Sequence, residues 1–171
     1  MRVIGRLRTG FTMALAWVSP RLLALVETRY NSVRTERLSD VLLVDRRGRV
    51  LRRSPLPAGL IVAAIEPSRA AVALLLIPEG SIGPPLLASI TSGGLRSVSL
   101  AEISAGDVPA DPTSPQPTAT TLRPGLAVDP NGRAFVVPPR GPVAEVELKS
   151  LAVTYHSPIT HRPRRPRPRT R

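Results

Sequence analysis

Four short apolar runs separated by turn sequences fill residues 125–156, and this pattern constrains the fold more than any other part of the chain. The stretch reads GLAVDPNGRAFVVPPRGPVAEVELKSLAVTYH. Its prolines interrupt it too often for a helix, and its valines and aromatic residues suit a pleated sheet. Because each run is joined to the next by a tight turn, the stretch predicts four antiparallel strands in a meander.

The turn between the first two of these runs has the composition of a type I turn. Asp129 accepts a hydrogen bond from the turn backbone, Pro130 presets φ, and Gly132 tolerates a left-handed exit. A second turn of the same kind lies at residues 45–48. Carboxylates in such places also hold cations or exchange protons, but turn capping accounts for both aspartates. We therefore predict structural turn residues at Asp45, Gly48, Asp129, Pro130, Asn131 and Gly132.

Less regular copies of the same unit precede residues 125–156. Residues 59–77 repeat the order Gly-Leu, apolar run, turn and second strand, and residues 86–100 add a hairpin. Residues 41–53 match only the second half of a unit. The continuous apolar run at 70–77 predicts a strand that is buried on both faces. The chain is thus predicted to be all-β, with antiparallel four-stranded meanders used about two and a half times.

Composition divides the chain into segments around these units. With five prolines and few large apolar residues, residues 104–124 bury too little surface to order themselves, and we expect an exposed loop. The last fifteen residues end in RPRRPRPRTR and are predicted to be a disordered basic tail. The predicted boundaries are 1–40 for a basic and apolar segment, 41–103 for a hairpin plus one unit, 104–124 for the Pro-rich loop, 125–156 for a unit, and 157–171 for the tail.

The first residues resemble a signal peptide, because three arginines precede an apolar run at 11–18. The run is short, however, and Pro20 and Arg21 interrupt the apolar content well before the roughly 20 residues that a spanning helix needs. We expect a core strand or short helix here, no membrane span, and a cytoplasmic protein in preference to an exported one.

The order GLAVDPNGRAFVV followed by VAEVELKSLAVTYH resembles the blades of YVTN-type and WD-repeat-like β-propellers of bacteria. The resemblance is best over residues 125–156, weaker over 59–100 and faint over 41–53, and the Gly-His and Trp-Asp dipeptides of true WD repeats are missing. It implies a radial array of four-stranded blades and no particular activity. Because propellers have about four to eight blades, two and a half blades imply either a fragment of a longer propeller or association with a protein partner or a second copy that covers the open blade edges.

Catalytic chemistry finds little support in the sequence. The chain has no cysteine, which excludes disulfides and thiolate metal sites. His156 and His161 are its only histidines, and their spacing of five suits neither one face of a helix nor one face of a strand. Neither a phosphate-binding glycine loop nor a nucleophile elbow is present. We therefore predict no catalytic, cofactor-binding or metal-binding residues and no cofactor.

The net charge of +12 is concentrated at the two ends of the chain, in residues 1–53 and 162–171. Arginines in the tail are suited to weak, salt-sensitive and non-specific contacts with nucleic acid, although no aromatic side chain there would stack on bases. The arginines concerned are Arg162, Arg164, Arg165, Arg167, Arg169 and Arg171.

Together these features favour a non-catalytic β-propeller-like binding or scaffold protein in truncated form. One alternative is a fragment of a propeller enzyme, a hydrolase or an oxidoreductase, whose site lies on missing blades. The other alternative is association with nucleic acid through the basic tail.

Overall fold

Twelve antiparallel strands make up the part of the chain that the computed structural model describes, residues 11–30, 37–79, 83–106 and 122–157, and this part contains no helix. The predicted Pro-rich loop and basic tail fall largely outside these residues. The strands are β1 (Phe11–Ser19), β2 (Leu22–Tyr30), β3 (Arg37–Asp45), β4 (Val50–Pro55), β5 (Leu60–Pro67), β6 (Val72–Pro78), β7 (Leu86–Thr91), β8 (Gly94–Ser99), β9 (Gly125–Val128), β10 (Arg133–Val137), β11 (Val143–Glu147) and β12 (Val153–His156).

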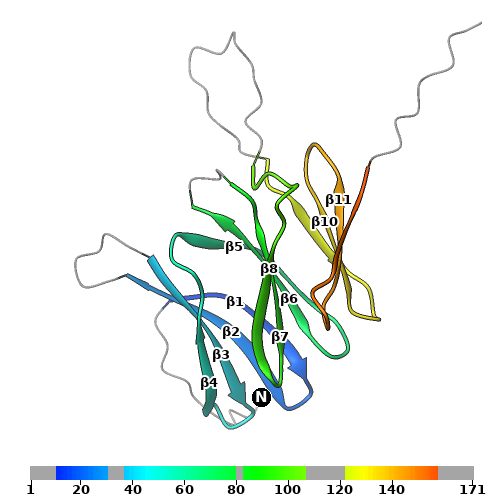
Figure 1. Cartoon of the computed structure of the whole chain (residues 1–171). Coiled ribbons are helices and arrows are strands. Elements are labelled where there is room, and N and C mark those ends of the chain that lie inside the picture. The colour runs from blue at the N-terminus through cyan, green and yellow to red at the C-terminus, as the bar shows by residue number, and fades with distance from the viewer. Residues whose placement is uncertain (1–10, 31–36, 80–82, 107–121, 158–171) are drawn as a thin grey trace, which may run out of the picture.

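Each group of four successive strands forms its own sheet (Figure 1). The first sheet has the order β1-β2-β3-β4, the second β5-β6-β7-β8 and the third β9-β10-β11-β12, and every strand pairs with its neighbour in the chain. The all-β fold of four-stranded antiparallel meanders is therefore confirmed. None of the three sheets is closed.

The first sheet is more complete than the sequence pattern predicted. The hairpin expected at residues 41–53 forms β3 and β4. The residues before it form β1 and β2, with β1 paired to β2 and β2 paired to β3. The described strands thus make three four-stranded sheets and not two and a half. The interruption at Pro20 and Arg21 is the turn of the β1–β2 hairpin.

The second sheet lies between the other two (Figure 1). Alternate residues of β6 face opposite neighbours, so that Leu74 packs in the cluster shared with the first sheet and Leu75 in the cluster shared with the third. All of β6 from Val72 to Ile77 is fully buried, as the continuous apolar run predicted. The first strands of successive sheets also contact each other, β1 with β5 and β5 with β9.

Within the described ranges no helix has the length and apolarity needed to cross a membrane.

Candidate functional site

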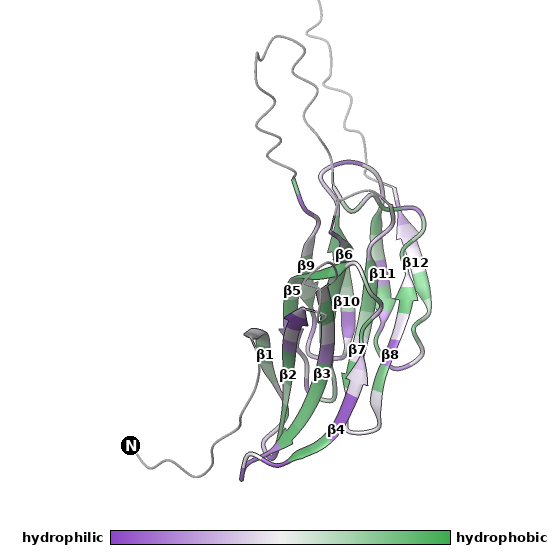
Figure 2. Cartoon of the chain, turned by 90° about the vertical axis from the view of Figure 1, so that its left-hand side faces the viewer, coloured by the Kyte–Doolittle hydropathy of each residue, from purple (hydrophilic) through white to green (hydrophobic). Residues whose placement is uncertain are grey.

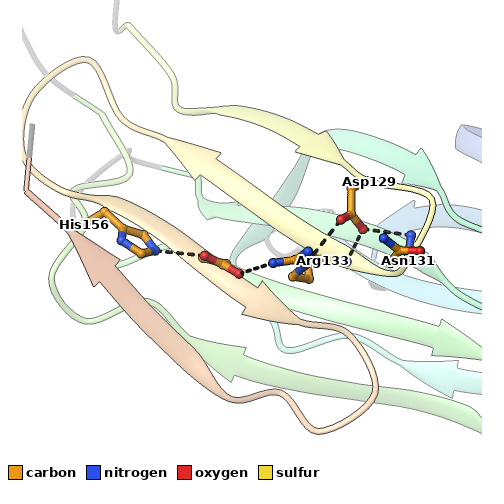
Figure 3. Close-up of polar contacts among 5 residues, drawn as sticks. Asp129, Asn131, Arg133 and His156 are labelled. Atoms are coloured by element: carbon orange, nitrogen blue, oxygen red, sulfur yellow. Dashed lines mark hydrogen bonds and ion pairs between the residues drawn. The ribbon is translucent and has the colours of Figure 1, made fainter.

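Asp129 closes the turn between β9 and β10 with its own side chain (Figure 3). Its Oδ1 accepts hydrogen bonds from the backbone N–H groups of Asn131 at 2.9 Å and Arg133 at 2.8 Å, and its Oδ2 lies 3.3 Å from Nε of Arg133. Gly132 has φ of 89°, the left-handed conformation that glycine adopts without strain. The backbone N–H of Arg133, followed by that of Asn131 and the charge of Arg133, holds the pKa of Asp129 below its ordinary value.

Asp45 builds the same local structure between β3 and β4. Its Oδ1 accepts from the N–H groups of Arg47 at 2.8 Å and Arg49 at 2.9 Å, and Gly48 has φ of 81°. The backbone N–H of Arg49 and then its side chain lower the pKa of Asp45. The two turns nevertheless occupy different places, because Asp45 joins the third and fourth strands of the first sheet and Asp129 joins the first and second strands of the third. The structure therefore does not bring the two carboxylates together.

The lowered pKa of Asp129 predicts a loss of stability in acid. The pKa of Asp129 is lower in the folded than in the unfolded protein. The ionised carboxylate therefore stabilises the fold at pH values above the ordinary aspartate pKa, and this stabilisation is lost as the pH falls through the folded-state pKa. We expect Asp129→Asn to unfold at a lower temperature than the wild type at about pH 7, with a difference that shrinks below about pH 4. Thermal unfolding across this pH series is the measurement. The exposed Glu66→Gln is the control, and a difference for Asp129→Asn that stays constant with pH would contradict the prediction.

A line of charged side chains crosses the outer face of the third sheet, which points away from the second sheet (Figure 3). Nη1 of Arg133 lies 3.4 Å from Oε1 of Glu145, and Nε2 of His156 lies 2.9 Å from Oε2 of the same carboxylate. His156 is the last residue of β12 and lies beside β11. Exposed pairs of this kind contribute only about 0–1 kcal/mol, so their main effect is to keep this face polar. His161 lies outside the described residues.

The outer face of the first sheet is apolar by contrast. In β1 and β2, alternate residues such as Ala16 and Ala24 pack against the second sheet, so the residues between them point the other way. Strand register places these outward residues in two rows, each crossing β1, β2 and β3. We call the six residues of the two rows the apolar face: Leu15, Leu25 and Leu42 in one row, and Trp17, Leu23 and Val44 in the other.

The apolar face is open on the side of β1. Leu15 is 57% and Trp17 52% exposed, whereas Leu25, Leu42 and Val44 are buried beneath their neighbours. Figure 2, which views the molecule from the side of the first sheet, shows hydrophobic colouring along much of β2 and β3. An aromatic side chain half exposed in such a row is the kind of group that a protein partner covers.

An ion cluster borders the apolar face. Glu27 of β2 and Asp40 of β3 are register partners and both are buried. Arg53 bridges them, with Nη2 3.0 Å from Oε2 of Glu27 and Nη1 2.6 Å from Oδ2 of Asp40, while Nη2 of Arg29 lies 3.5 Å from the same Oδ2. The hydrogen bond to Asp40 is the main cause that raises the pKa of Arg53. Sequence reasoning missed this cluster because its members come from three strands whose register the sequence alone did not define.

A cavity of about 500 Å³ opens between the second and third sheets, at the end where their hairpin turns meet. The β7–β8 hairpin contributes Thr91 and Gly94 to its wall, and the predicted structural turn between β9 and β10 contributes Pro130, Asn131 and Gly132. In the described part of the chain, no group of three or more histidine, cysteine or acidic residues is arranged to hold a metal ion.

No protein-family model matches the chain, and no curated protein or solved structure matches it either. Function is therefore inferred from the faces and the cavity of the molecule itself.

Proposed function

We propose that this chain is a non-catalytic protein-binding module of β-propeller-like architecture, in which the three sheets act as blades. Support comes from the sheet topology, since four successive antiparallel strands make up each blade of a propeller. The contacts of β1 with β5 and of β5 with β9 add to it, because the first strands of successive blades lie next to each other around a propeller axis.

The observation that carries the proposal is the apolar face of the first sheet. The sheets already associate by covering one apolar sheet face with another, through the clusters on either side of the second sheet. Leu15 and Trp17 remain 57% and 52% exposed at the β1 side of the apolar face, so a partner could bury them in the same way. Burying such side chains lowers the free energy by roughly 25 cal/mol for each Å² of apolar surface removed from water.

A second copy of the chain is the occupant that fits best. In a head-to-tail array, the apolar face of one copy would meet the outer face of the third sheet of the next, where Arg133, Glu145 and His156 would lose water without gaining partners. A two-fold arrangement instead places the apolar face against its own equivalent, so that each Trp17 packs on apolar side chains of the other copy. We therefore infer a symmetric dimer of six stacked sheets.

Measurement of mass against protein concentration by sedimentation or light scattering tests this dimer. The wild type is expected to dimerise, and Trp17→Arg to weaken the dimer roughly 30-fold or more, as loss of a central aromatic anchor does. Trp17 is the only tryptophan, so its emission should shift to the blue as the wild type dimerises.

Val137→Arg is the matched control, since Val137 is an exposed apolar residue at the C-terminal end of β10 in the third sheet. This variant should dimerise as the wild type does. A wild type that stays monomeric at high concentration, or a dimer lost in Val137→Arg and kept in Trp17→Arg, would overturn the proposal.

A further inference from the structure

The cavity between the second and third sheets has the size and position of a ligand site. In a four-stranded antiparallel meander, the turn after the first strand and the turn after the third lie at the same end of the sheet. Two such turns from each sheet therefore surround the cavity, and Arg69, Thr91, Asn131 and Lys149 come one from each turn. Its volume of about 500 Å³ falls within the roughly 300–1,000 Å³ of small-molecule sites.

Positive charge predominates around the cavity. Three cations line it, Arg69, Arg96 and Lys149, against the single carboxylate of Glu147. Arg96 is held across the gap between the two sheets, because its Nη1 donates to the backbone oxygen of Lys149 at 3.2 Å. That contact fixes the guanidinium at the edge of the cavity and leaves further N–H groups for an anion.

Ser89 gives the second, independent indication of a ligand. It is only 3% exposed, it lines the cavity, and its Oγ has no hydrogen-bond partner among the described residues. A buried hydroxyl without a partner is costly, and native proteins seldom keep one. Ser89 is also the register partner of Arg96 on the neighbouring strand, which places the hydroxyl and the guanidinium side by side on the face toward the third sheet.

We propose that this cavity binds a small organic anion. Its carboxylate or phosphate group would accept hydrogen bonds from Oγ of Ser89 and from the guanidinium of Arg96, with Arg69 and Lys149 adding positive charge. Its apolar body would lie against the aliphatic part of the lining, such as Leu148. This site is separate from the apolar face of the first sheet, so the tests of anion binding and of dimerisation are independent of each other.

Calorimetric titration of the full chain with benzoate, phenyl phosphate and benzyl alcohol tests the proposal. We expect at least one of the two anions to bind saturably, and the neutral alcohol to bind at least about tenfold more weakly, because it lacks the charge that Arg96 recognises. The two anions distinguish a carboxylate site from a phosphate site. Equal binding of the alcohol and the anions, or no binding of either anion, would overturn the proposal.

Variants then locate the binding. Arg96→Gln and Arg69→Gln should each weaken the anion roughly three- to tenfold, and the exposed Arg69→Gln remains informative if Arg96→Gln fails to fold. Ser89→Ala should weaken binding severalfold without lowering the unfolding temperature, since the hydroxyl has no partner to lose.

Arg47→Gln makes the same charge change in a distant turn and should leave affinity unchanged. If Arg47→Gln weakens binding as much as Arg69→Gln does, the attraction is only general charge and the site is refuted.

Discussion

Replacing Leu75 with alanine should lower the free energy of unfolding by about 2–5 kcal/mol, the usual cost of a cavity in a well-packed core. Leu74→Ala should cost about as much. Both side chains lie in β6 with 0% exposure, but Leu74 packs toward the first sheet and Leu75 toward the third. Urea unfolding followed by far-ultraviolet circular dichroism measures the loss.

Leu75→Ala also tests whether the three sheets unfold together. Trp17 fluorescence reports on the first sheet alone, whereas Leu75 faces the third sheet. In a cooperative molecule, Leu75→Ala lowers the midpoint seen by fluorescence as much as the midpoint seen by circular dichroism. Protein concentration is held constant because the proposed dimer would shift both midpoints. The exposed Leu51→Ala should change stability by less than about 0.5 kcal/mol, and a fluorescence midpoint unaffected by Leu75→Ala would show that the sheets unfold separately.

Arg53→Gln is the second change with a large expected effect, a loss of about 1–3 kcal/mol. Removing one partner of a fully buried ion pair costs about 3–5 kcal/mol, and the lower figure allows for the 46% exposure of the Arg53 side chain. The variant leaves Glu27 and Asp40 opposite each other on neighbouring strands, both buried, with Arg29 3.5 Å from Asp40. Chemical unfolding at about pH 7 gives the loss directly.

A second substitution distinguishes repulsion between the carboxylates from poorer packing. Adding Glu27→Gln to the variant should recover part of the stability at about pH 7, because it removes one of the two facing charges. A loss that Glu27→Gln does not recover would contradict the electrostatic explanation. Arg47→Gln, an exposed arginine in a turn, serves as the charge-matched control.

Much of the fold could be predicted from the sequence because its information is local. A turn such as Asp129 to Gly132 joins two strands that are adjacent in the chain, so turn composition and apolar runs together define the hairpin. Apolar and polar residues do not alternate in β6, and this pattern indicated a strand that is buried on both faces. The hairpin of β1 and β2 was harder to recognise, because its turn at Pro20 and Arg21 lacks the Asp-to-Gly pattern of the turns that begin at Asp45 and Asp129.

The candidate sites were not predictable in the same way. The pairing of Glu145 with His156 depends on the register of β11 with β12, and the cluster around Arg53 depends on three strands at once. The cavity beside Ser89 depends on how two sheets pack face to face. Each of these features joins residues whose proximity follows from packing and register, for which short sequence patterns carry no signal.

The strictly successive pairing of strands also has a consequence for synthesis of the protein. All partners of the first sheet have been made once Pro55 leaves the ribosome, but the sheet that covers its inner face is complete only at Ser99. At about 5–20 residues per second, translation needs roughly 2–9 seconds to cover that interval. During this time the nascent first sheet has apolar side chains on both faces, and we expect it to be the part of the chain most dependent on chaperones.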